Sequence, residues 1–135
     1  MKRILIALVT LALIGGGVAY YMWNKPHQNM ATAKTDVTIE AGALFEAYNA
    51  DENACNAKYL DKVIAVSGTV KEVTNDEGTI KVSLDTGGDF GVRCELSTTA
   101  THTRTDFSPG ERITVKGTCS GFNFDVQLTN CVVLQ

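Results

Sequence analysis

The feature that most constrains this chain is an uninterrupted apolar run near its N-terminus. Residues 4–23 carry no charged side chain, and they directly follow Lys2 and Arg3. An α-helix rises about 1.5 Å per residue, so roughly 20 residues cross a hydrocarbon core of about 30 Å. We therefore predict that residues 1–23 form a signal-anchor helix that passes once through the inner membrane, which residues 4–23 would contact.

The same segment also fits a cleaved signal peptide, and the sequence leaves this alternative open. Residues 4–14 would then be the apolar stretch, and cleavage near Ala19 would release a secreted domain. Three amphipathic rings favour a retained anchor, because such rings lie well at the headgroup level of a membrane. These rings belong to Tyr20, Tyr21 and Trp23.

Four cysteines in the rest of the chain favour an extracytoplasmic domain. An even number of cysteines in a short exported domain is more often a disulfide framework than a set of thiols. We therefore predict that the C-terminal domain lies in the periplasm. The disulfide candidates are Cys55, Cys94, Cys119 and Cys131.

Length and charge limit what the rest of the chain can be. Residues 24–38 are polar and read as a tether, and residues 39–135 then have room for one hydrophobic core and one domain. Without Lys2 and Arg3, the chain has 10 basic against 15 acidic residues, a net charge of −5. Nucleic-acid binding by bulk electrostatics needs the opposite sign, so nucleic acid is a disfavoured partner.

Helical spacing follows the tether over residues 39–59. Four apolar residues recur on one helix face: Ala43, Leu44, Ala47 and Tyr48. Thr38 is the expected N-cap of this helix. A second short helix follows, with Asp51 or Asn53 as its N-cap.

After residue 61 the apolar residues recur at every second position, which is typical of β-strands. The expected strands cover residues 63–73, 79–84, 90–96, 111–119 and 124–134. Five strands with an irregular connection after the third describe a mainly β fold, a five-stranded OB-fold barrel with short N-terminal helices. Gly68 and Gly117 would supply the bulge or bend that a small barrel needs. By the same alternation, Phe90 points inward.

The cysteine pairing stays open, because four cysteines allow three arrangements. The third and fifth strands are neighbours in an OB barrel, which favours Cys94 with Cys131. Simple alternation places Cys94 inward and Cys131 outward, so this pair requires a bulge near Asn130. The alternative is Cys94 with Cys119, which share the inward direction. Free buried thiols are a further alternative.

The sequence contains no catalytic constellation, so we expect a protein that is not an enzyme and has no cofactor. No Cys-x-x-Cys occurs, and His27 and His102 lie far apart, so we predict no metal site. A cysteine nucleophile would need His102 beside Cys94 or Cys119. The Gly-Gly pair at residues 87–88 lacks the Lys-Ser or Lys-Thr of a phosphate loop.

An OB barrel binds its ligands on the face of its second and third strands. The outward side chains that we predict to bind a ligand are Lys81, Ser83, Arg93 and Glu95. No aromatic ring is among them for base stacking, which again disfavours single-stranded nucleic acid. Three phenylalanines at loops or strand ends either form an apolar lip or plug the barrel ends: Phe107, Phe122 and Phe124.

Two groups of residues carry a resemblance to a known family. The first is KVIAVSGTV at residues 62–70 with VRC at 92–94, and the second is GERITVKGTCSG at 110–121 with Cys131. They resemble the bacterial OB-fold envelope family named for its similarity to tRNA anticodon-binding domains, and residues 23–27 are similar to its Bacteroidota-type members. The resemblance implies a helical element on an OB barrel, displayed by a membrane anchor. It implies no ligand, because fold does not fix function.

Three functions remain compatible with these residues. The first is a membrane-anchored, non-catalytic binding module whose ligand is an envelope protein or a carbohydrate. The second is an OB-fold nucleic-acid-binding protein that uses Lys81 and Arg93. The third is a structural or stress-response role for the anchored domain.

Overall fold

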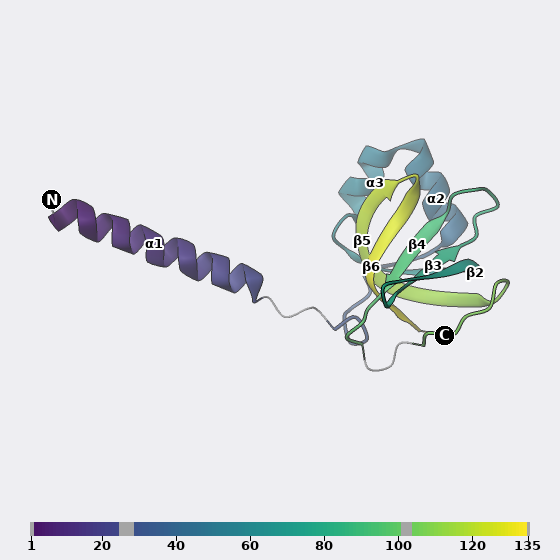
Figure 1. Cartoon of the computed structure of the whole chain (residues 1–135). Helices are drawn as coiled ribbons and strands as arrows, with labels where there is room; N and C mark the ends of the chain where they lie inside the picture. Colours follow the sequence, from purple (N-terminus) through teal and green to yellow (C-terminus); the bar gives the residue numbers. More distant parts are fainter. Residues whose placement is uncertain (1, 25–28, 101–103, 135) are drawn as a thin grey trace.

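The structure, a computed structural model, describes residues 2–24, 29–100 and 104–134. Its first helix, α1 (Lys2–Trp23), stands apart from a barrel domain (Figure 1). The helix α1 is long and apolar enough to cross a membrane, and no residue of α1 is buried. The apolar helix expected from the sequence is therefore confirmed, while its retention or cleavage near Ala19 stays a prediction.

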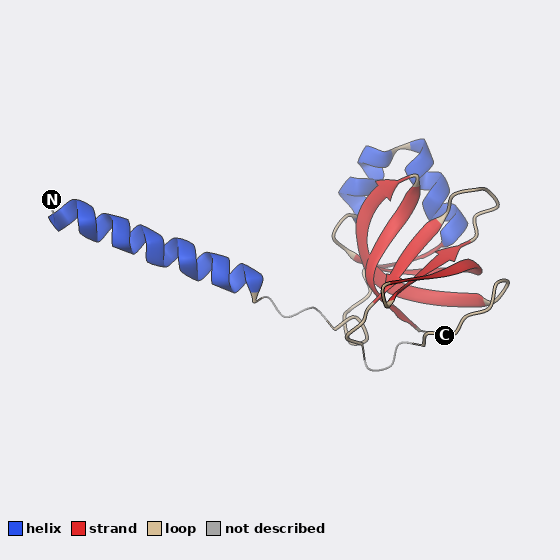
Figure 2. Cartoon of the chain, viewed as in Figure 1, coloured by secondary structure: helices blue, strands red, loops and turns tan. Residues whose placement is uncertain are grey.

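The barrel domain contains two short helices and six strands within the described residues (Figure 2). The helices are α2 (Ala41–Ala50) and α3 (Glu52–Tyr59). The strands are β1 (Val37–Glu40), β2 (Val63–Asp76), β3 (Thr79–Leu84), β4 (Val92–Leu96), β5 (Arg112–Asn123) and β6 (Asp125–Val133). The mainly β class predicted from the sequence is confirmed.

Five of these strands close into a barrel, as the alternation predicts. Antiparallel pairs join β2 to β3, β3 to β4 and β5 to β6, while β4 and β6 run parallel. The strand β2 closes the barrel because it pairs with two of the other barrel strands, β3 and β5. Its residues 63–69 pair with β5, and residues 70–76 pair with β3. A register shift at Lys71 marks the change of partner.

The sixth strand, β1, lies outside the barrel and was not predicted. Val37 pairs with Ile64 and Glu40 with Ser67, both in parallel register with β2. Residues 37 and 38, which the sequence assigned to the tether, therefore belong to the sheet. A four-residue strand with two apolar side chains has too short an alternation to stand out from a polar segment.

Of the N-caps predicted for the two short helices, the one for α2 is wrong and one for α3 is confirmed. Thr38 does not cap α2, because Thr38 lies within β1 and Glu40 occupies the N-cap position without a side-chain hydrogen bond. Asp51 does cap α3, since its carboxylate accepts a hydrogen bond from the backbone N–H of Ala54 at 3.0 Å.

The segment before β1 is docked on the barrel. Met30 is 3% exposed and packs against Val63 and Val132. Lys116 is the one buried polar or charged residue among the described residues, and its Nζ donates to the carbonyl oxygens of Ala31 at 3.3 Å and Ala33 at 2.9 Å. A buried ammonium group requires such acceptors, because its removal from water is costly. The docking leaves residues 24–28 between α1 and the barrel.

The barrel core consists of the inward side chains that the alternation predicts, together with Leu44 and Tyr48 of α2. The confirmed inward strand positions include Ile64, Val66, Val70, Val82, Leu84, Val92, Cys94, Leu96, Ile113 and Val115. The prediction for Phe90 is wrong, since its side chain is 47% exposed. Phe90 precedes β4, so strand alternation does not apply to it.

Two glycines occupy positions without space for a side chain. An added Cβ at Gly68 would lie 2.9 Å from the Cβ of Ala41, the first residue of α2. Gly68 therefore allows the helix to approach, and the bulge expected there lies at Lys71 instead. Gly117 does lie at a register shift, as predicted, and an added Cβ there would collide with the sulfur of Cys131.

We expect Gly68→Ala to lower the free energy of unfolding by about 1–3 kcal/mol, because the new methyl group overpacks the contact between β2 and α2. Gly42→Ala is the matched control, since an added Cβ at Gly42 of α2 meets nothing within 4 Å. This control should be neutral or stabilise the protein by up to about 1 kcal/mol. Urea unfolding of the full chain measures both effects, and similar values for the two variants would contradict the packing argument.

Candidate functional site

The four residues predicted to bind a ligand lie together on the outer face of β3 and β4. Lys81 is opposite Glu95, and Ser83 is opposite Arg93. Lys81 and Ser83 are half-buried, whereas Arg93 and Glu95 are exposed. The parallel strand β6 adds Gln127 beside Arg93. We call these five residues the polar face, and their binding role stays a prediction.

Both cations of the polar face have carboxylate partners. The guanidinium of Arg93 lies 3.4 Å from the carboxylate of Asp125, and the ammonium of Lys81 lies 3.2 Å from that of Asp76. Asp125 also accepts a hydrogen bond from the backbone N–H of Gly91 at 2.7 Å, which fixes the carboxylate at the start of β6. Because each positive charge is compensated, the face attracts phosphate groups only weakly.

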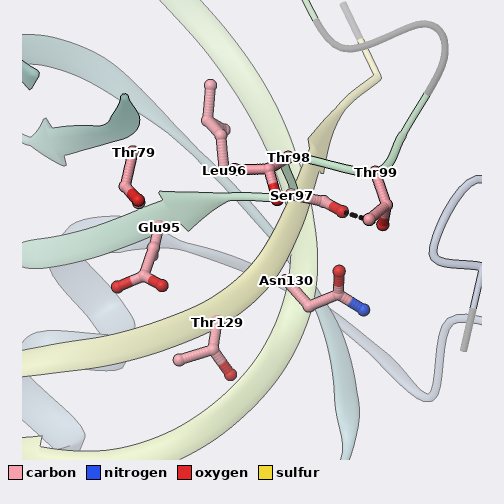
Figure 3. Close-up of a pocket in the computed structure, with 8 residues that line it drawn as sticks. All are labelled: Thr79, Glu95, Leu96, Ser97, Thr98, Thr99, Thr129 and Asn130. Atoms are coloured by element: carbon pink, nitrogen blue, oxygen red, sulfur yellow. Dashed lines mark hydrogen bonds between the residues drawn. The ribbon is translucent and has the colours of Figure 1, made fainter. Parts of the chain in front are cut away.

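A polar pocket opens where β4 and the polar face end (Figure 3). Its volume is about 300 Å³, and it is lined by Thr79, Glu95, Leu96, Ser97, Thr98, Thr99, Thr129 and Asn130. The hydroxyl groups of Ser97 and Thr99 are hydrogen-bonded to each other at 3.2 Å. Hydroxyl and amide groups donate and accept hydrogen bonds, and a carboxylate accepts them. The lining therefore suits a ligand rich in hydroxyl or amide groups.

Of this polar lining, the sequence identified only Glu95. Thr129 and Asn130 join Glu95 because β6 pairs with β4 across a long stretch of chain. Alternation along one strand predicts which side chains point outward, but it does not predict which strands become neighbours. The closure of the barrel supplies that missing information.

The opposite end of the polar face carries aromatic rings. Phe90 from the β3–β4 loop stacks on Phe124 from the β5–β6 turn, with ring centroids 5.4 Å apart and planes inclined by 28°. Phe124 is 68% exposed and belongs to an apolar lip. Phe107 and Phe122 are half-buried and pack against the core, as the alternative reading expected.

The bulge that the cysteine pairing requires is present. Cys94 pairs with Leu128, whereas Leu96 pairs with Cys131, so β6 contains one extra residue between these pairs. Asn130 lies within this interval and has a φ of 53°. The bulge turns Cys131 into the barrel, where both Cys94 and Cys131 are fully buried.

All four cysteines are free thiols in the structure, so the predicted disulfide is not formed there. The thiol of Cys94 is close enough to that of Cys131 to raise the Cys131 pKa. The thiol of Cys119 instead contacts the hydroxyl group of Tyr48 at 3.3 Å. The two candidate pairings are therefore not equivalent, because Cys94 has Cys131 as its thiol partner and Cys119 has a phenol.

The environment of Cys131 and Tyr48 keeps these two groups protonated. Burial raises the pKa of the Cys131 thiol well above its ordinary value, and the neighbouring thiol of Cys94 raises this pKa further. Burial, and then the contact with Cys119, likewise raise the pKa of the Tyr48 hydroxyl. A protonated, buried thiol is a poor nucleophile. Cys131 therefore acts as a small apolar side chain in the thiol form.

The structure does not test the predictions that involve the two histidines. His27 and His102 both lie outside the described residues, so the expectations for a zinc site and for a cysteine–histidine pair are not tested. Among the described residues, no group of three His, Cys, Asp or Glu side chains is suited to a metal ion.

Comparisons with known proteins identify a family and a fold. A family model described as tRNA_anti-like matches residues 1–133. A search of curated proteins found no match. A lipoprotein from Klebsiella pneumoniae subsp. pneumoniae, whose description proposes nucleic-acid binding without establishing it, has a similar structure, with a TM-score of 0.59, 17% sequence identity, and coverage of 82% of this chain and 100% of that chain. At this identity the similarity establishes the fold alone.

Two further structural similarities are weaker. The S. pombe Stn1–Ten1 complex has a TM-score of 0.43, 19% identity, and coverage of 54% of this chain and 58% of that chain. Yeast Stn1 and Ten1 give a TM-score of 0.47, 14% identity, and coverage of 81% of this chain and 70% of that chain. Neither similarity is strong enough to support an inference about this chain.

We expect the barrel to lose stability as the pH rises above the ordinary pKa of a thiol, about 8.5. The raised pKa values of Cys131 and Tyr48 mean that the folded state keeps protons that the unfolded state releases. This contribution to stability is complete below the unfolded-state pKa values and is lost as the pH rises from there through the folded-state values. Urea unfolding from about pH 7 to about pH 10.5 measures it. A constant midpoint over this range would contradict the raised pKa values.

Proposed function

Because the chain belongs to the tRNA_anti-like family of OB-fold proteins, we propose that it works as a membrane-anchored binding module without catalytic activity. The family supplies a fold and no activity, so the proposal rests on this chain's own residues. The observation that carries it is the combination of an unburied apolar helix, α1, with a barrel that presents the polar face and its pocket. An anchor and a hydrogen-bonding surface suit recognition at a membrane.

We propose that α1 stays in the inner membrane and that the barrel lies in the periplasm. The basic residues Lys2 and Arg3 begin α1, and cytoplasmic ends of membrane helices are enriched in such residues. Tyr20, Tyr21 and Trp23 lie at the other end of α1, where they suit a headgroup layer. Cleavage near Ala19 would instead release the same barrel as a secreted protein.

The ligand that we favour for the polar face is an envelope protein or a carbohydrate. Both present hydroxyl and amide groups that match the donors and acceptors of the pocket. A nucleic-acid ligand finds weaker support, because the carboxylates of Asp76 and Asp125 compensate Lys81 and Arg93. A structural or stress-response role would leave this face without a specific ligand.

Site-specific photocrosslinking in intact cells tests the polar face. A photoreactive amino acid at Ser83 should give one specific adduct with an envelope protein or a glycan. The same probe at Arg112, an exposed residue on β5, is the control and should not give this adduct. No adduct at all, or the same mixture of abundant proteins from both positions, would contradict the proposal and favour a structural role.

Titration with single-stranded DNA and RNA at low salt tests the nucleic-acid alternative. We expect no saturable binding by the full chain, because the two cations of the polar face are compensated. Binding that weakens steeply with salt, and is lost in a Lys81→Gln/Arg93→Gln variant, would favour the nucleic-acid function instead.

An added cysteine tests the topology cleanly, because all four native thiols are buried and give little background. Thr74 is exposed on β2, so Thr74→Cys should react with a membrane-impermeant thiol reagent in intact cells once the outer layer is permeable. Lys2→Cys, at the opposite end of the anchor, should react only after lysis. The reverse pattern would place the barrel in the cytoplasm.

The same experiment reports on the cysteines. After denaturation, with and without a reductant, labelling of the native chain shows whether Cys94 and Cys131 become oxidised in cells. Their mutual contact makes them the pair that we expect to be bridged in an oxidising compartment.

A further inference from the structure

The turn between β5 and β6 contains a residue that local backbone rules disfavour. Asn123 pairs with Asp125, so Phe124 alone occupies the tip, with a φ of 62°. This left-handed conformation suits Gly or Asn, and it strains a bulky residue. The ring of Phe124 is 68% exposed, so burial does not offset the strain. Strained residues of this kind concentrate at binding sites.

A second loop brings another exposed ring to the same place. Phe90 stacks on Phe124 and is itself 47% exposed. Among the described residues of the barrel domain, the other exposed large hydrophobic residues are Leu60 and Leu134. The stacked pair is therefore a local feature and not part of a generally apolar surface.

The stacked rings border a hollow of about 420 Å³. We call it the aromatic hollow, and its lining consists of Phe45, Asn49, Glu52, Phe90, Phe122, Asn123 and Phe124. The ring of Phe122 stacks on the buried Tyr48 with centroids 5.5 Å apart, and it meets Phe45 edge-on at 6.1 Å. The inner wall is thus tied to the barrel core, which makes the site rigid before a ligand arrives.

The polar groups of the hollow limit the charge of a ligand. Asn49, Asn123 and Glu52 line the hollow, and no Lys or Arg among the described residues does so. Two cations of neighbouring strands are already engaged. Lys71 donates to the carbonyl oxygens of Gly88 at 2.6 Å and Asp89 at 3.2 Å, and Arg93 pairs with Asp125. A carboxylate without a free cation beside it disfavours phosphate and sulfate groups.

We propose that the aromatic hollow binds a pyranose ring of an oligosaccharide that carries no phosphate or sulfate. A pyranose ring has an apolar C–H face that packs on aromatic rings, whose π faces carry partial negative charge. Its hydroxyl groups require both donors and acceptors, which the two amides and the carboxylate supply. The combination of a few polar groups with an aromatic wall is typical of small-ligand sites.

This site is separate from the polar face, so it goes beyond the function proposed above. In Figure 1 the β5–β6 turn lies beside α2 and α3, on the other side of the barrel from the segment that leads in from α1. The docked residues Met30 to Ala33 therefore do not cover the hollow. A glycan in the aqueous space has access to it.

Calorimetric titration of the full chain in phospholipid nanodiscs tests the proposal, with chitohexaose, cellohexaose and maltohexaose as probes. Nanodiscs avoid detergents with sugar headgroups, which would compete for the site. We expect saturable binding of at least one hexasaccharide. In saturation-transfer NMR, the ring C–H protons of that sugar should receive magnetisation from the protein.

Phe124→Gly separates binding from folding. Gly adopts the left-handed conformation without steric strain, so the unfolding midpoint should stay the same or rise. Loss of the ring should weaken sugar binding by at least about fivefold. Leu134→Ala removes another exposed apolar side chain and should bind the sugar as the unchanged chain does.

Several results would overturn the proposal. The first is no binding of any of the three sugars, and the second is binding of an oligothymidylate alone. A third is sugar binding that survives Phe124→Gly but is lost in Arg93→Ala, which would move the ligand to the polar face and leave the proposed function intact. A lower unfolding midpoint of Phe124→Gly with unchanged binding would make the ring purely structural.

Discussion

The barrel depends on the double pairing of strand β2. One half of β2 pairs with β5 and the other half with β3, and the strand changes partners at the irregularity around Lys71. This arrangement removes the free edges that an open five-stranded sheet would expose. It also requires Gly68, which lets α2 lie against the strand. The position of α2 in turn sets where Phe45 meets the rings of the β5–β6 hairpin.

Much of the fold could be predicted because local sequence and tertiary structure agree. The alternation of apolar residues identified all five barrel strands, and the parity conflict between Cys94 and Cys131 indicated the irregularity near Asn130. The docked segment around Met30 could not be predicted in this way. Its burial depends on Val63 and Val132, which are distant in sequence and meet only after the barrel has closed.

The candidate sites could be predicted only in part from the sequence, for the same reason. Outward parity placed Lys81 and Arg93 on one face, but their carboxylate partners come from the end of β2 and from the start of β6. Phe90 was misplaced because a strand pattern was extended into a loop. A usable signal for the aromatic end was present at residues 123–125, where a large apolar residue stands between Asn and Asp, both common in turns.

The docking of Met30 and the carbonyl contacts of Lys116 determine how far the barrel can travel from a bilayer that holds α1. Only a handful of residues link Trp23 to the docked segment, and fully extended they span at most roughly 20 Å. A ligand near the lipid surface would experience a high effective concentration of this protein, while one deeper in the surrounding space would lie beyond its reach.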